Sequence, residues 1–189
     1  MKNIHQFFVW ALLISPLFAF GQVTVAGTIN SPIEEPVCDV LVTLLDDMGQ
    51  TVDQEITDNT GTFSFADVPA NNTYSLRLEK EDNAINGTST FDLVMIARGI
   101  LGIDPLDPYQ LWAADVNNSG SVTTLDMVFI RQIILSITTE FNVPNWLFGF
   151  PDASGGSDMI NLGEVTGNLD LDIIGVKAGD MNYTAMGCN

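Results

Sequence analysis

Two segments of the chain, residues 90–101 and 124–135, repeat one another at a constant offset of 34 positions. Six of the twelve positions are identical, and in both copies the apolar residues recur with the 3.6-residue period of a helix. Chance rarely produces so close a repeat. Each copy also has a Ser or Thr placed to cap the helix and an acidic residue in its first turn. The sequence therefore predicts two short amphipathic helices, either as a plain packing hairpin or as a repeated binding unit.

The loop that leads into the second helix, residues 115–126, carries oxygen-bearing side chains at loop positions 1, 3, 5, 9 and 12. Gly120 stands at position 6, where such a loop must turn sharply. A hard cation such as Ca²⁺ needs six to eight oxygen ligands, and this spacing wraps them around one point. The predicted ligands, with Ser121 acting through its backbone carbonyl, are Asp115, Asn117, Ser119, Ser121, Thr123 and Asp126. With only two carboxylates, we expect an affinity of about 10⁻⁴ M to 10⁻⁵ M.

The loop before the first helix, residues 81–92, departs from this pattern. Glu81, Asn83 and Asp92 keep positions 1, 3 and 12, but Ile85 has no oxygen to offer at position 5. Asn86 replaces the turn glycine, although Asn tolerates the left-handed backbone. We therefore expect a second calcium site here that is weak, assisted by the backbone, or empty.

The order of loop, helix, linker, loop and helix over residues 80–136 resembles the dockerin type I repeat pair, most closely in the second copy. Position 12 is Asp rather than the Glu of an EF-hand, and residues 109–114 are too short for a good entering helix. The resemblance implies calcium and a protein partner, the cohesin domain. It places partner recognition at loop positions 10 and 11, which are Thr90, Phe91, Thr124 and Leu125. The other interpretation is that Phe91 and Leu125 fill the core and that calcium is purely structural.

Residues 22–79 show the alternation of apolar and polar residues that is typical of strands. Five or six short runs, separated by turn signals, predict a small antiparallel β-sandwich. Residues 57–65 (TDNTGTFSF), together with residues 25–29 and 42–46, resemble the carboxypeptidase regulatory-like domain and its relatives, the collagen-binding-protein B-type repeats. This resemblance implies a transthyretin/prealbumin-like sandwich that serves as a stalk, spacer or adhesive module and carries no catalytic residues.

Residues 1–21 have the pattern of a signal peptide. Lys2 precedes an apolar run, and Ala19 and Gly21 are small residues at the −3 and −1 positions of a cleavage site. A transmembrane helix would need about 20 apolar residues, and this run is shorter and contains Pro16. We therefore expect a bacterial protein that is secreted or at the cell surface and has no transmembrane segment after cleavage.

Cleavage of a signal peptide would change the charge and the histidine content of the mature chain. Without residues 1–21, 5 basic side chains against 24 acidic ones leave a formal charge of −19 and no histidine. These numbers exclude Ser-His-Asp and Cys-His catalysis and His-ligated zinc, and they make nucleic-acid binding unfavourable. In an oxidising compartment Cys38 and Cys188 form a disulfide, or else remain as a buried and a free thiol.

Residues 137–189 form an aromatic-rich tail. Its first part carries Phe141, Trp146, Phe148 and Phe150, which we expect to pack on the repeat pair; the alternative is an aromatic platform for a glycan. The segment from Asp170 begins like another short helix, and Asp180 and Asn182 then look like the start of an uncompleted calcium loop. Similar tails follow such repeat pairs in exported proteins of the Bacteroidetes type.

The sequence thus predicts an α+β multidomain chain. Its parts are a signal peptide (1–21), a β-sandwich (22–79), a dockerin-like repeat pair (80–136) and a tail (137–189). The expected function is that of an exported, non-catalytic calcium-binding module in extracellular protein assembly, within a polysaccharide-degrading system. The alternative is a surface adhesin or structural stalk that binds a glycan or host protein. A small two-carboxylate glycosidase is the enzyme class weighed against both, and we expect no enzyme.

Overall fold

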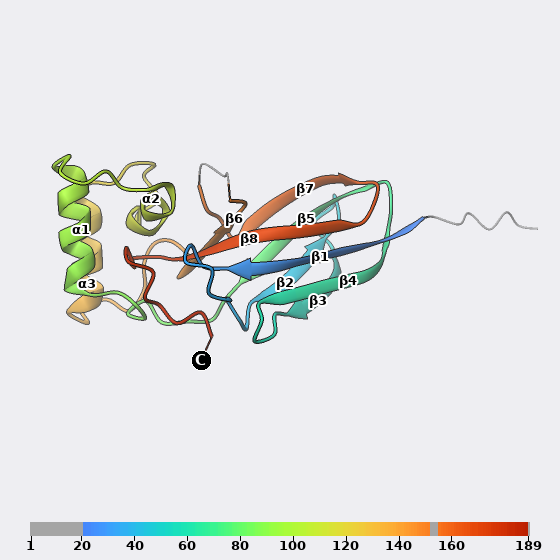
Figure 1. Ribbon diagram of the computed structural model, residues 1–189, viewed down its shortest axis with the longest axis horizontal. Coiled ribbons are helices and arrows are strands. Elements are labelled where there is room, and N and C mark those ends of the chain that lie inside the picture. The colour runs from blue at the N-terminus through green and yellow to red at the C-terminus, as the bar shows by residue number, and fades with distance from the viewer. Residues whose placement is uncertain (1–20, 152–154, 189) are drawn as a thin grey trace, which may run out of the picture.

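The structure, a computed structural model, describes residues 21–151 and 155–188. Within these residues the chain forms an elongated molecule with two lobes, one of two four-stranded sheets and one of three helices (Figure 1). This arrangement confirms the predicted α+β class. The expected signal peptide lies outside the described residues, except for Gly21. In the part of the chain that the structure describes, no helix is long and apolar enough to cross a membrane.

The two sheets form the sandwich lobe. The first sheet has the strand order β4 (Thr62–Pro69), β1 (Gln22–Asn30), β8 (Leu169–Lys177) and β6 (Trp146–Gly149). The second has the order β3 (Thr51–Ile56), β2 (Leu41–Leu45), β5 (Asn72–Glu79) and β7 (Met159–Val165). Neighbouring strands are antiparallel except β1 and β8, which are parallel. One apolar cluster, with buried side chains from both sheets, joins them.

The first five strands follow the alternation in the sequence. In β1 the buried residues Val25, Gly27 and Ile29 alternate with the partly exposed Ala26 and Thr28. The turn before β4 needs Gly61, which has a φ of 72° and whose added Cβ would lie 2.4 Å from the carbonyl oxygen of Ile29. Phe63 and Phe65 follow on one face of β4, both buried, with ring centroids 5.8 Å apart.

The tail completes the sandwich, which the sequence did not predict. β8 pairs with β1, β7 pairs with β5, and β6 pairs with β8, so the repeat pair is an insertion between β5 and β6. The helix expected from Asp170 was wrong, because Leu169, Leu171 and Ile173 alternate with polar residues and form β8. Of the four tail aromatics expected to pack on the repeat pair, only Phe141 packs against the apolar cluster of the helical lobe. Trp146, Phe148 and Phe150 belong to the sandwich cluster instead, so for these three the expectation was wrong.

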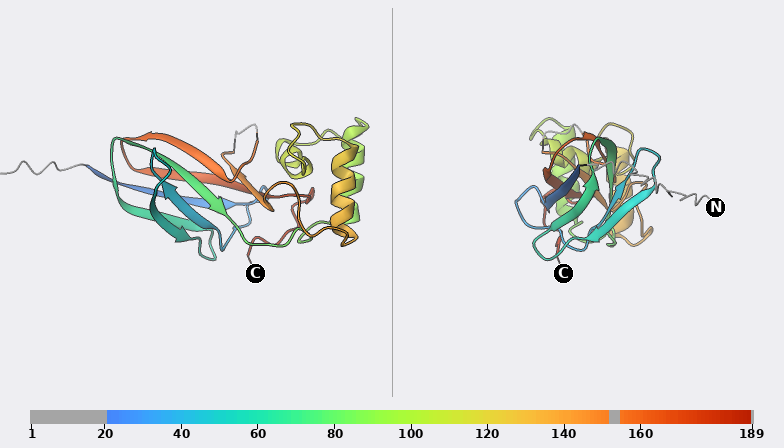
Figure 2. Two further views of the ribbon diagram at one scale, coloured as in Figure 1. Left: turned by 180° about the vertical axis from the view of Figure 1, so that it is seen from behind. Right: turned by 90° about the vertical axis from the view of Figure 1, so that its right-hand side faces the viewer.

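The helical lobe caps one end of the sandwich (Figure 2). α1 (Thr90–Ile100) and α3 (Thr124–Ile134) lie side by side, with α2 (Pro108–Ala114) between them and the sandwich. Ile96 and Ile130, which are equivalent in the repeat, are fully buried in a second apolar cluster with Trp112. The sequence did not predict α2: Asp107 caps it in a reciprocal pair with Gln110, and burial of Trp112 stabilises a helix too short to persist alone.

A C-terminal segment, residues 178–188, returns from the helical lobe toward the sandwich (Figure 1). It ends at Cys188, which a disulfide joins to Cys38. The two cysteines are 150 residues apart in the sequence and their Cα atoms are 4.9 Å apart. Of the two alternatives for the cysteines, the structure therefore has the disulfide.

Candidate calcium centre

The second loop, residues 115–126, curls around the carboxylate of Asp115. Its Oδ1 accepts a hydrogen bond from the backbone N–H of Ser119 at 2.9 Å, and its Oδ2 accepts one from that of Gly120 at 2.7 Å. Positive φ angles at Asn118 (55°) and Gly120 (80°) make this sharp turn possible. The turn therefore places the side chain at loop position 1 against the backbone of positions 5 and 6.

A capping box fixes the other end of the loop on α3. The Oδ2 of Asp126 accepts hydrogen bonds from the backbone N–H of Thr123 at 2.9 Å and from its hydroxyl at 3.1 Å. The Thr123 hydroxyl in turn accepts a bond from the N–H of Leu125. The capping hydrogen bonds satisfy Oδ2 of Asp126, a residue that is fully buried at the start of the helix, but they leave its Oδ1 without a donor.

Two oxygens of this loop are buried without a hydrogen-bond donor. They are Oδ1 of Asn117 at position 3 and Oδ1 of Asp126 at position 12; the third such atom among the described residues is Nε1 of Trp112. Buried polar atoms are normally paired, and an unpaired one costs about 1–3 kcal/mol. Both oxygens belong to predicted ligands, and a bound cation would satisfy them. The residues of the second loop therefore fit a calcium ion.

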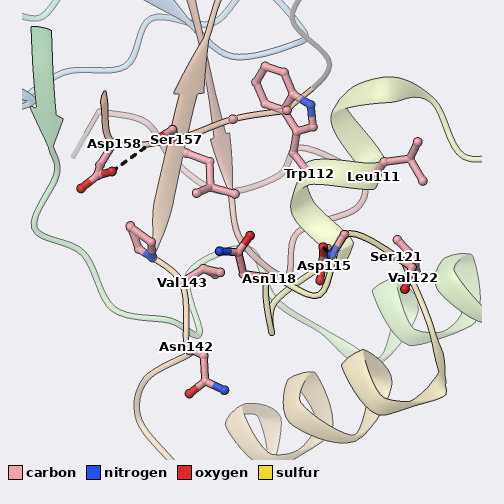
Figure 3. A pocket seen from close by; sticks show the side chains of 15 residues that line it. Leu111, Trp112, Asp115, Asn118, Ser121, Val122, Asn142, Val143, Ser157 and Asp158 are labelled. Atoms are coloured by element: carbon pink, nitrogen blue, oxygen red, sulfur yellow. Dashed lines mark hydrogen bonds between the residues drawn. The ribbon is translucent and has the colours of Figure 1, made fainter. Parts of the chain in front are cut away.

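The remaining predicted ligands lie close by. The Ser119 hydroxyl donates to the backbone carbonyl of Ser121 at 3.0 Å, so these two ligand groups face one another. Asp115 and Ser121 also line a cavity of about 400 Å³, with Trp112 and Asn118 of the helical lobe and with residues from 142–147 and 155–158 (Figure 3). Among the described residues, no three or more His, Cys, Asp or Glu side chains are placed to hold a metal ion together. The second loop offers two carboxylates, Asp115 and Asp126, and otherwise neutral oxygens.

The first loop, residues 81–92, differs in its interior. Asn83 Oδ1 accepts the backbone N–H groups of Ile85 and Asn86, and Glu81 is exposed. Asp92 is fully buried in the same capping box as Asp126, with Oδ2 accepting from the N–H of Ser89 at 2.7 Å and from its hydroxyl at 2.8 Å. Its Oδ1, however, accepts the backbone N–H of Met181 at 2.7 Å. The predicted ligands of the first loop therefore do not fit a calcium ion as those of the second do.

A lysine that no pattern in the sequence indicated as a site residue, Lys177, lies at the first loop. The Nζ of Lys177, a residue only 2% exposed, donates to the carbonyl oxygens of Ala84 and Ala178, both at 3.4 Å. Burial lowers its pKa to about 8, and the charges of Asp82 and Asp180 oppose that shift. Burial also raises the pKa of Asp180, while hydrogen bonds from the backbone lower it.

The predicted partner-binding residues are at the surface. Phe91 is 56% exposed and Leu125 is 52% exposed, and Thr90 and Thr124 are exposed as well. The interpretation that Phe91 and Leu125 fill the core was therefore wrong. The aromatic residues of the tail do pack inside: Trp146 and Phe148 are buried, while Phe141 and Phe150 are partly buried against the two clusters.

The arrangement defines a class of protein, a two-sheet sandwich that carries an inserted pair of capped loop-helix repeats. Residues 81–135 match the family model of the Dockerin type I domain, which confirms the resemblance of the repeat pair. The match indicates a calcium-binding module of protein–protein assembly, and it covers the helical lobe but not the sandwich.

Comparisons with solved structures and with curated proteins do not indicate a function for this chain. The chain is similar to a solved structure described as "Crystal structure of BcpA, the major pilin subunit of Bacillus cereus", with 9% identity and a TM-score of 0.40. The similarity covers 83% of this chain and 30% of that one, so the chain spans less than a third of the pilin subunit. No curated protein matches the chain.

Proposed function

We propose that this chain is an exported, non-catalytic module that docks through α1 and α3 onto a cohesin-like protein partner, in a manner that depends on calcium. The proposal extends the match of residues 81–135 to the Dockerin type I domain. Its setting would be an extracellular assembly that degrades polysaccharide, to which the chain contributes attachment rather than chemistry.

One observation carries the proposal: an exposed apolar stripe that occurs in both repeats. The helix stripe comprises Phe91, Val94 and Leu101 in the first repeat and Leu125, Val128 and Leu135 in the second. Each residue is exposed, and each stands 34 positions from its equivalent. The residues that pack between the helices, Ile96 and Ile130, are also equivalent. The repeat thus preserves an outer apolar face as well as a core, and exposed apolar patches of this kind mark interaction sites.

Calcium would hold the second half of this face in place. Bound at the second loop, the ion would supply positive charge to Asp115 and Asp126 and would tie the loop to α3. The chain itself orients the groups: the capping box holds Asp126, and the N–H groups of Ser119 and Gly120 hold Asp115. Leu125 lies in the first turn of α3, next to Asp126, so its position depends on the same cap.

Two features support export. The N-terminal residues have the pattern of a signal peptide, and Cys38 and Cys188 form a disulfide, a bond that persists in oxidising compartments. We keep the carboxypeptidase regulatory-like assignment of the sandwich as a prediction, and with it a role as the spacer that carries the docking lobe.

The test is surface plasmon resonance of the mature chain over immobilised type I cohesin domains, in calcium and in chelator. We expect binding to be weaker in chelator than in calcium, and we expect Phe91→Ser with Leu125→Ser to weaken it in calcium at least about 30-fold, the effect of losing one hot spot. If the two repeats offer equivalent faces, each single variant retains binding. Met48→Ser, which removes an exposed apolar side chain from the β2–β3 turn, is the matched control. Binding that is equal in both buffers, or unchanged by the double variant, would contradict the proposal.

A further inference from the structure

The two repeats place equivalent aspartates in equivalent helix caps, but the two side chains differ in the hydrogen bonds that their Oδ1 atoms accept. Asp92 and Asp126 are each fully buried at the third helical position, with Oδ2 in a capping box. Oδ1 of Asp126 has no donor, whereas Oδ1 of Asp92 accepts the N–H of Met181 at 2.7 Å. A backbone group of the C-terminal segment therefore reaches the oxygen that would bind the ion in a loaded loop.

The first loop also has a cation of its own. The ammonium group of Lys177 is buried at the end of β8, on the carbonyl oxygen of Ala84 inside the loop. Asp82 and Asp180 supply the opposing negative charge, and the ring of Phe141 lies 6.0 Å from the ammonium nitrogen. A buried ammonium is costly unless charges and carbonyl oxygens surround it, and these groups provide that environment.

The C-terminal segment is fitted closely against the first loop. The Oδ2 of Asp180 accepts the N–H of Ala185 at 2.6 Å, which folds this segment back on itself. Asn86, at the turn position of the loop, donates through Nδ2 to the carbonyl of Met186 and accepts the N–H of Met186. A Cβ added to Gly87 would lie 2.6 Å from Asp180 Oδ2 and 2.7 Å from the nitrogen of Ala185, so only glycine leaves room. The disulfide at Cys188 then anchors the segment to the sandwich.

We propose that the chain closes its first loop by itself, with the ammonium of Lys177 and the N–H of Met181 in place of an ion, so that the protein binds one calcium, at the second loop. The second part of this inference rests on the proposed function; the first part does not. It follows that the two halves of the helix stripe are held by different means, the α1 half by the C-terminal segment and the α3 half by calcium.

Calorimetric titration of the mature chain with calcium tests the inference. We expect one equivalent for the wild type, none for Asp126→Asn, and one for Asp92→Asn. Two equivalents, with one of them lost in Asp92→Asn, would overturn the inference and leave the proposed function standing. No binding by any form would refute the calcium centre of the proposed function but would agree with a first loop that takes no ion.

Terbium luminescence locates the ion without relying on a variant in either capping box. Trp112 lines the same cavity as Asp115 in the second loop, whereas Trp146 donates through Nε1 to Asp82 in the first loop at 2.8 Å. We expect terbium emission excited through tryptophan to fall strongly in Trp112→Phe and to remain in Trp146→Phe. Emission that depends on Trp146 would place an ion at the first loop and overturn the inference.

A third measurement reports on Lys177 directly. Lys177→Met should lower the melting temperature by the same amount in calcium and in chelator, because the lost group acts at a loop that takes no ion. Lys177→Arg, which keeps the charge, should restore part of the loss. An unchanged melting temperature in Lys177→Met would contradict a role for the ammonium group.

Discussion

Replacement of Asn117 with alanine should change the stability of the protein in opposite directions with and without calcium. In chelator, Oδ1 of Asn117 is buried without a donor, and such an atom costs about 1–3 kcal/mol. Alanine removes the atom and gives up little packing, because the residue is only half-buried. We therefore expect the free energy of unfolding of Asn117→Ala in chelator to equal that of the wild type or to exceed it by up to about 1 kcal/mol.

In calcium the same oxygen is a predicted ligand. Calcium at a hundred times its dissociation constant stabilises a folded protein by about 2.7 kcal/mol. If loss of this ligand weakens binding tenfold, the variant forfeits about 1.4 kcal/mol of that stabilisation. The effect of the substitution should therefore differ by about 2 kcal/mol between the two buffers.

Urea unfolding followed by the helical circular dichroism signal measures this difference, since α1 and α3 are the longest helices among the described residues. Asn142→Ala is the matched control, because Asn142 lines the cavity beside the second loop but lies outside that loop, and the variant should behave alike in both buffers. A loss of stability by Asn117→Ala that is the same in calcium and in chelator would refute the reasoning, since Asn117 would then act through packing alone.

Three further predictions concern the sandwich and its connection to the C-terminal segment. Gly61→Ala should lower the free energy of unfolding by about 2 kcal/mol or more, measured in urea, because the residue has a φ of 72° and its Cβ would collide with a backbone carbonyl. Hydrogen bonds from Thr60 and Thr62 lower the pKa of Asp58 to about 2 from 3.8, so Asp58 stabilises the fold above pH 3.8 and loses that contribution as the pH falls through 2. Asp58→Asn should therefore show a shallower loss of stability over this acidic range than the wild type, and an unchanged slope would contradict the assignment. Cys38→Ser with Cys188→Ser should lower the free energy of unfolding by about 5 kcal/mol, since the bond closes a loop of 150 residues, and reduction of the wild type should have the same effect on its urea midpoint.

Local patterns in the sequence correctly predicted the elements that are stabilised by contacts between residues close together in the chain. β1 to β5 follow alternation and turn residues, and the second loop follows the spacing of its oxygens. β8 was misassigned because its partner β1 lies some 140 residues earlier in the chain and pairs with it in parallel, at Val25↔Leu169, so no nearby turn marks it. α2 was missed because seven residues carry too little helical periodicity; the sequence signal that could have identified it is Asp107, followed by proline and then Gln110.

The spacing of residues in the first loop could not predict which groups satisfy its buried oxygens, for a similar reason. Its departures at Ile85 and Asn86 indicated weakness, but the groups that close it, Lys177 and Met181, come from a segment almost 100 residues later. The spacing of Asp180 and Asn182 did signal an uncompleted calcium loop. In the structure Asp180 turns instead toward the N–H of Ala185, which folds the C-terminal segment over the first loop.

The topology attaches the two repeats to the sandwich in different ways. β8 lies in the middle of the first sheet and ends at Lys177, so the strand that completes the sandwich also delivers the ammonium group to the first loop. The C-terminal segment then continues over that loop to the disulfide, so α1 is attached to the sandwich by covalent and polar contacts that do not involve an ion. Within the described residues no segment donates a hydrogen bond to the buried Oδ1 atoms of Asn117 and Asp126, and under the proposed function calcium takes that place. Removal of calcium should therefore loosen the α3 half of the helix stripe and leave the α1 half in place, so that docking weakens without unfolding of the molecule.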